Sequence, residues 1–168
     1  NAVVKAFEKN IPGMNYKIFK NIAKKVVSNN RDMVYRYTRD LFKELKKKNY
    51  YLLAISHSPK EIVQDFTREW GFDSFYGRVY EVSDNKFTGK TLHLDLISDK
   101  SKMLKYAIKK ENLTLNNSIG VGDSESDISL LKMVEKPICF NPNKKLYTTA
   151  KRLGWKIVVE RKDVIYNL

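Results

Sequence analysis

The chain has 168 residues and a formal net charge of +13 at pH 7, and 42% of its residues are hydrophobic. This length suits one domain, or one domain with a small appendage, and the hydrophobic content is enough to form a core. No run of eighteen apolar residues occurs, so we expect no membrane-spanning helix. Cys139 is the only cysteine, which excludes an internal disulfide, and no charged-then-apolar leader is visible. We therefore expect a cytoplasmic protein.

The first part of the chain is predicted to be helical. Apolar residues recur at helical spacing through residues 1–33, with an interruption at Ile11-Pro12-Gly13. A further helix is expected from about Asp32 to Lys48, with Asn49 at its C-terminal cap. We place a domain boundary here, between a helical piece (1–33) and the remainder (34–168).

The remainder alternates strands and helices. The near-continuous apolar run from Tyr50 to Ser56 predicts a strand buried on both faces. Ser58 is expected to cap a helix that ends at Gly71. The later elements expected are a β-hairpin at 75–90, a helix at 99–111, a strand at 118–121, a helix to about 134, a strand at 136–140, a helix at 144–153 and a strand at 155–159. This alternation predicts an α/β fold with a doubly wound parallel sheet.

The positive charge is spread along most of the predicted helices. Its densest cluster, Lys46-Lys47-Lys48, lies at a helix C-terminus, where cations interact favourably with the helix dipole. The pattern favours a solvated, lysine-rich surface over a nucleic-acid-binding stripe. Nucleic acid is therefore not an expected partner, although a basic face could still attract an anionic substrate.

The segment from Ser118 to Asp127 carries the most informative motif. A short apolar strand ends at Gly122, and two carboxylates, Asp123 and Asp127, follow before a helix. Oxygen ligands at the C-terminal end of a parallel strand suit a hard cation such as Mg²⁺. A purely structural alternative stays open, because Ser124 to Asp127 also reads as a capping box at a helix N-terminus.

Two further residues have the character of an anion site. Ser56 ends a buried strand directly ahead of a helix, and because Ser58 is expected to cap that helix, Ser56 is left for another role. Lys100 lies one turn before Met103 and Ala107, on the same apolar face of its helix. A lysine on a buried face needs an anionic partner, since an unpaired buried charge is costly; the alternative is a side chain that snorkels to solvent.

Four residues resemble the second, third and fourth motifs of the haloacid dehalogenase (HAD) superfamily, both in their order and in their positions at the ends of elements. They are Ser56, Lys100, Asp123 and Asp127. The resemblance covers residues 33–160 and extends to the subgroup that includes the phosphoserine phosphatases. That subgroup shares the segments Ser56-His-Ser-Pro59, Gly71-Phe-Asp73, Phe87-Thr-Gly89 and Phe140-Asn-Pro142.

The resemblance implies a Mg²⁺-dependent phosphomonoester hydrolase that works through an aspartyl-phosphate. Ser56 would hydrogen-bond a phosphoryl oxygen, and Lys100 would neutralise charge on the nucleophile and the phosphate. Asp123 would ligate Mg²⁺, and Asp127 would hold the metal shell in place.

The family pattern also indicates a pocket lining and a class of substrate. His57, next to the phosphate-binding serine, and Asn141, after the fourth strand, are expected at the rim of the pocket. Neither His57 nor His93 is expected to bind a metal. The substrate would be a small phosphorylated metabolite: phosphoserine, another phosphomonoester or a nucleotide.

One motif of the family does not occur in this sequence. It is a strand ending Asp-x-Asp-x-Thr, which carries the nucleophile and lies in the sheet between the strands ending at Ser56 and Asp123. We therefore expect a HAD-like Rossmannoid core without its first central strand, together with a partial helical cap and a small β-hairpin. We infer that the chain is a C-terminal piece of a longer protein, and that by itself it is inactive and unstable.

Two other functions stay open. The chain could be a non-catalytic HAD-like binding protein that uses its basic surface for nucleic acid or a protein partner. The presence of Lys100, Asp123 and Asp127 argues for the enzyme, because a HAD-like protein that has lost catalysis has no chemical need of them. Phosphotransferase or dehalogenase chemistry on the same fold is the remaining alternative.

Overall fold

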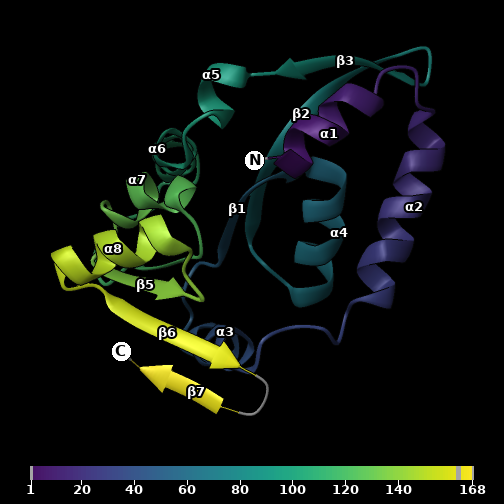
Figure 1. Cartoon of the computed structure of the whole chain (residues 1–168). Coiled ribbons are helices and arrows are strands. Elements are labelled where there is room, and N and C mark those ends of the chain that lie inside the picture. The colour runs from purple at the N-terminus through teal and green to yellow at the C-terminus, as the bar shows by residue number, and fades with distance from the viewer. Residues whose placement is uncertain (1, 162–163, 168) are drawn as a thin grey trace. The chain divides into compact units, whose positions relative to one another are not determined.

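The computed structural model describes residues 2–161 and 164–167, and positions 1, 162, 163 and 168 lie outside this description (Figure 1). The chain divides into two compact units, residues 1–97 and 98–168. The predicted boundary near residue 33, between a helical cap and an α/β core, stays a prediction.

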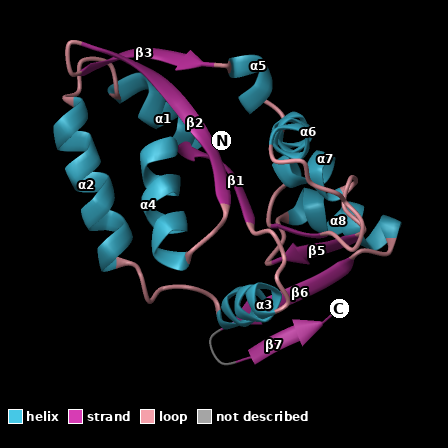
Figure 2. Ribbon diagram, turned by 180° about the vertical axis from the view of Figure 1, so that it is seen from behind, coloured by secondary structure: helices cyan, strands magenta, loops and turns pink. Residues whose placement is uncertain are grey.

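The first unit contains a three-stranded sheet and five helices in its described residues. Its elements are α1 (Ala2–Asn10), α2 (Tyr16–Asn29), α3 (Arg36–Lys47), β1 (Leu53–Pro59), α4 (Lys60–Trp70), β2 (Ser74–Ser83), β3 (Lys86–Leu92) and α5 (Leu94–Ile97). β1 pairs with β2 in parallel, and β2 and β3 form the expected antiparallel hairpin (Figure 2). α4 lies between α2 and the β1–β2 pair in both views.

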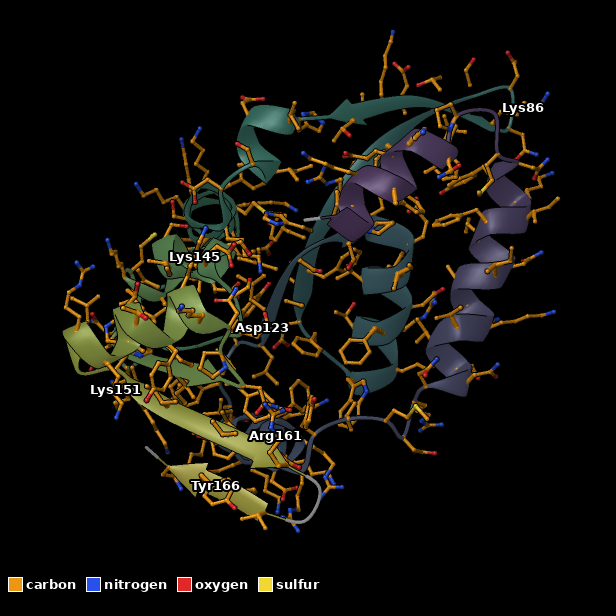
Figure 3. All side chains as sticks on the ribbon, in the orientation of Figure 1. Lys86, Asp123, Lys145, Lys151, Arg161 and Tyr166 are labelled. Atoms are coloured by element: carbon orange, nitrogen blue, oxygen red, sulfur yellow. The ribbon has the colours of Figure 1, made fainter. Side chains whose placement is uncertain are left out.

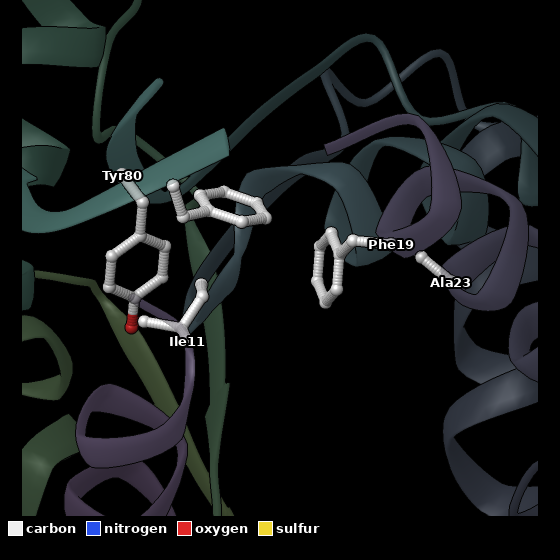
Figure 4. Packing of buried hydrophobic residues seen from close by; sticks show 5 residues of the cluster. Ile11, Phe19, Ala23 and Tyr80 are labelled. Carbon is white, nitrogen blue, oxygen red and sulfur yellow. The ribbon is translucent and has the colours of Figure 1, made fainter. Parts of the chain in front are cut away.

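The core of this unit joins the N-terminal helices to the hairpin. Phe19, Ala23 and Ile11 pack with Tyr80 and Phe87, and all five side chains are buried (Figure 4). The rings of Phe19 and Phe87 meet edge to face, with their centroids 5.2 Å apart. Such pairs add to the stabilisation that comes from burying apolar area. Ile11 and the α2 residues Phe19 and Ala23 therefore share a core with the hairpin.

The start of α4 differs from its prediction. Ser58 is not the N-cap: β1 continues through Pro59, the helix begins at Lys60, and no side chain caps it. The reason is that Pro59 itself has extended backbone (φ −51°, ψ 139°) and pairs with Arg78 of β2, so helical backbone begins one residue later than predicted. The predicted end at Gly71 is confirmed, since Gly71 adopts the left-handed conformation with φ of 74°.

The strand β1 is less buried than its apolar sequence predicts. Its residues are half-buried, apart from the exposed Ser58, so the expectation of burial on both faces is wrong. Within the described residues β1 has a strand neighbour on one side only, which leaves it at the edge of its sheet.

The second unit has a four-stranded sheet, in the order β4-β5-β6-β7. Its elements are α6 (Lys100–Lys110), β4 (Ile119–Gly122), the 3₁₀ turn η1 (Glu125–Asp127), α7 (Ile128–Leu131), β5 (Lys136–Phe140), α8 (Lys144–Leu153), β6 (Lys156–Arg161) and β7 (Val164–Asn167). β4, β5 and β6 are parallel, as expected, and β7 adds an antiparallel strand that the sequence did not reveal. Among the described strands, β4 pairs only with β5 and so also lies at a sheet edge.

The core of the second unit lies where α7 and α8 pack on β5 and β6. Leu131, Cys139, Leu146, Ala150 and Ile157 are buried together there. α7 is shorter than the predicted helix to about residue 134, because it ends at Leu131. Across residues 2–161 and 164–167, no helix is both long enough and apolar enough to cross a bilayer.

Candidate active site

The acidic loop after β4, residues 123–127, is the centre of the candidate site. β4 ends at Gly122, which pairs with Cys139 of β5, so the loop begins at the C-terminal edge of the parallel strands. A Cβ atom added at Gly122 would lie 2.4 Å from the Cβ of Asp127. Only glycine therefore lets the loop fold back so closely over the strand end.

Asp127 organises this loop from its inner side. It is 4% exposed, and its Oδ2 accepts hydrogen bonds from the backbone N–H of Asp123 (3.0 Å), the backbone N–H of Ser124 (3.0 Å) and the Ser124 hydroxyl (3.2 Å). The reciprocal bonds between Ser124 and Asp127 make the predicted capping box. The predicted capping box is therefore confirmed, and the acidic residues of the site remain a prediction.

Lys100 supplies the opposite charge. Its ammonium donates to Asp127 Oδ1, and the two side chains are only 12% and 5% exposed. This confirms that the lysine on the buried face of α6 has an anionic partner. Burial opposes ionisation of Asp127, but the ammonium and the backbone N–H donors outweigh it, so the pKa of Asp127 is lowered.

Asp123 has the opposite electrostatic setting. Partial burial of its carboxyl raises its pKa, and the negative charge of Asp127 raises it further. Asp123 is nevertheless exposed, directly after β4 in the chain, and it is labelled in Figure 3. The loop therefore presents the accessible Asp123 carboxylate, backed by the Asp127 carboxylate, whose oxygens are already occupied.

The donor set allows a partial cation site. No cluster of three or more His, Cys, Asp or Glu side chains suited to a metal was found among the described residues. Mg²⁺ keeps several waters and is often held by one or two carboxylates. Asp123 fits that requirement as a single ligand, while Asp127 fits a supporting position better than a ligand position.

Asn141 lies at the same sheet edge, directly after β5. Its backbone N–H donates to the carbonyl of Val158 (2.9 Å), and its Oδ1 accepts from the N–H of Glu160 (2.9 Å). Its Nδ2 is buried and has no hydrogen-bond partner within the described part of the chain. The side chain thus ties β5 to β6 and keeps its amide nitrogen, with two N–H donors, for another acceptor.

Ser56 and His57 belong to the other compact unit. Both are half-buried in β1, and Ser56 Oγ accepts a hydrogen bond from the N–H of Ser58 (3.1 Å). The hydroxyl oxygen thus accepts one local hydrogen bond, and its O–H is left to donate. Because Ser58 does not cap α4, the argument that a capping Ser58 leaves Ser56 for another role does not hold. That Ser56 and His57 join Lys100 and Asp123 in one site remains a prediction.

Two contacts of the acidic loop could not be predicted from the sequence. The amide of Asn143, the N-cap of α8, donates to the Glu125 carboxylate, and its backbone N–H donates to the carbonyl of Asp123 (2.8 Å). An asparagine directly before a helix signals its capping role. The contacts with Glu125 and Asp123 depend on the packing of α8 beside the loop, which no local pattern reveals.

The family model of the haloacid dehalogenase-like hydrolases matches residues 1–132. The chain therefore belongs to this family, and its α/β fold is the HAD fold.

Relatives with assigned names point in the same direction. The chain is 26% identical over 127 residues to phosphoserine phosphatase SerB1 of Mycobacterium tuberculosis, across 75% of this chain and 41% of the relative. It is 27% identical over 103 residues to the phosphoserine phosphatase of Methanocaldococcus jannaschii, across 60% of this chain and 48% of the relative. A crystal structure of phosphoserine phosphatase in its apo form superposes with a TM-score of 0.61 at 27% identity, covering 74% of this chain and 60% of that one. The chain spans less than half the length of these two curated relatives.

Proposed function

We propose that this chain forms part of a Mg²⁺-dependent phosphomonoester hydrolase that acts on a small phosphorylated metabolite in the cytoplasm. The observation that carries the proposal is the buried Lys100–Asp127 pair, which holds the acidic loop so that the Asp123 carboxylate reaches the surface at the end of β4. A purely structural capping box needs neither the lysine nor an accessible second carboxylate. Phosphoserine is a candidate substrate, because the relatives above carry the name phosphoserine phosphatase.

Each residue has a distinct part in the proposed chemistry. Asp123 would hold the cation, which when bound stabilises negative charge on the transferring phosphoryl group. Lys100 keeps Asp127 ionised and places one positive charge beside the loop. Asp127 fixes the backbone N–H groups of Asp123 and Ser124, and so fixes where the Asp123 side chain begins.

The remaining roles come from the resemblance. Ser56 would donate to a phosphoryl oxygen, and His57 and Asn141 would line the pocket. The buried, unpartnered Nδ2 of Asn141 supports such a contact. The nucleophile would be an aspartate of an Asp-x-Asp strand, which the printed sequence does not contain.

The test is the coding sequence upstream of Asn1, followed by an assay of the polypeptide that it encodes. An apolar strand ending Asp-x-Asp-x-Thr should appear there, and the longer product should release phosphate from p-nitrophenyl phosphate and phosphoserine only with Mg²⁺. Asp123→Asn should abolish turnover, whereas Lys105→Met, an exposed lysine of α6, should not. Residues 1–168 alone should show no turnover. Mg²⁺-dependent turnover by residues 1–168 would contradict the expectation that this piece is inactive alone. An upstream strand without the aspartates would show that the proposal is wrong.

A further inference from the structure

Asn143 connects the acidic loop to the helix α8 through three hydrogen bonds. Its backbone N–H donates to the carbonyl of Asp123 (2.8 Å), and its Nδ2 donates to the carboxylate of Glu125. Its Oδ1 accepts from the N–H of Leu146 (3.0 Å), in the first turn of α8. The backbone donor and both polar atoms of the side chain are therefore used, and two of the three bonds end in the loop.

We propose that Asn143 is a positioning residue for Asp123, which clamps the acidic loop to the N-terminus of α8 and so holds the Asp123 carboxylate in place for a divalent cation. The inference rests on the proposed function, because it assigns Asp123 to the cation. Asn143 itself would touch neither cation nor substrate.

The charges of the loop explain why it needs a clamp. Asp123, Glu125 and Asp127 lie within five residues, and their carboxylates repel one another. Lys100 neutralises Asp127 from the inner side. Glu125, on the outer side, is held by Asn143 and by the more distant ammonium of Lys145 at 4.0 Å. The loop is thus held at both of its other carboxylates, Asp127 and Glu125.

Helix capping by itself does not account for this geometry. Asn15 caps α2 in the same way, since its Oδ1 accepts from the N–H of Ile18 at 3.1 Å. Capping uses only the amide oxygen. Asn143 also directs its amide nitrogen to Glu125 and its backbone N–H to Asp123. The two asparagines therefore form a matched pair that separates capping from clamping.

The test compares Asn143→Ser with Asn15→Ser in the longer polypeptide that the upstream coding sequence encodes, because residues 1–168 alone are expected to be unstable. Serine is as good an N-cap as asparagine, but it is too short to cap α8 and reach Glu125 together. Mn²⁺ serves as a paramagnetic substitute for Mg²⁺, and line broadening of the backbone amide signals of Asp123 and Ser124 reports its binding. Asn143→Ser should weaken the apparent Mn²⁺ affinity about tenfold, as expected for a residue that supports a metal ligand. Asn15→Ser should leave it unchanged, and both variants should melt at nearly the same temperature.

A second variant tests the same contact from the other side. Glu125→Ala, at a side chain that is 49% exposed, should fold normally. In that background Asn143→Ser should cause little further loss of affinity, because the two residues act through one contact.

The outcomes separate the two proposals. Equal Mn²⁺ affinity for Asn143→Ser and the unaltered chain would make Asn143 a helix cap only and leave the proposed function standing. Additive losses for Asn143→Ser and Glu125→Ala would equally refute the clamp. Absence of broadening near Asp123 in the unaltered chain at millimolar Mn²⁺ would overturn both the cation role of Asp123 and the role of Asn143.

Discussion

Replacing Lys100 by methionine should destabilise the chain strongly, although it keeps the length of the side chain. The change leaves the carboxylate of Asp127 buried at 5% side-chain exposure without its counter-ion. Removing one partner of a buried ion pair costs about 3–5 kcal/mol. Asp127 retains its three donors from Asp123 and Ser124, so we expect a loss at the lower end, about 3 kcal/mol.

The size of the loss should depend on pH. The pKa of Asp127 is lowered in the folded chain, so its pairing stabilises the fold above the unfolded-state value, about 3.9. This stabilisation disappears as pH falls through the folded-state pKa, because the protonated carboxyl no longer needs the ammonium. The difference between Lys100→Met and the unaltered chain should therefore be large at pH 7 and should shrink as pH falls below the unfolded-state value of about 3.9.

Urea unfolding followed by circular dichroism measures both effects. Lys105→Met is the matched control, because that lysine lies on the same helix α6 and is exposed; it should change the free energy of unfolding by less than about 0.5 kcal/mol. The double variant Lys100→Met/Asp127→Asn should regain much of the loss, since no buried charge is then left unpaired. A loss for Lys100→Met no larger than for Lys105→Met, or a loss that persists unchanged at pH 2, would refute the argument.

Three further outcomes follow from the same unit. Asp123→Asn should stabilise the chain at pH 7 in urea unfolding, because the folded-state pKa of Asp123 is raised and its ionisation costs stability. The gain should vanish near pH 2, and a gain that persists there contradicts the cause. Gly122→Ala should cost about 1–3 kcal/mol in thermal unfolding, since the new methyl group meets Asp127; an unchanged melting temperature would mean that the loop can move away. Burial, followed by the charge of Asp127, raises the pKa of Cys139 to about 11. Its thiol should therefore react with a disulfide reagent at pH 8 only as fast as the unit unfolds. Rapid labelling of the native chain would contradict the burial of Cys139.

The sequence predicted elements well where the signal is local. Helical spacing located α2, α3 and α6, because a helix buries the residues that recur every three or four positions. Gly71 and Gly154 end their helices in the left-handed conformation, as expected for a residue without a side chain. The prediction failed at Ser58, where the preference of serine for a helix N-cap competes with extended backbone, and the strand continues through Pro59.

The candidate site shows the same difference between what local sequence patterns predict and what the tertiary structure decides. The sequence alone placed Lys100 on the buried face of its helix and Asp123 and Asp127 at the end of a strand, because these placements follow from periodicity. Only the tertiary structure decided that Asp127, 27 residues from Lys100, is its partner, and that Asn143 grips Glu125 from the start of α8. Those pairings depend on how the ends of β4 and β5 meet α6 and α8 in space. Local sequence patterns carry no information about that arrangement, because each element would form with the same periodicity whichever neighbour it met.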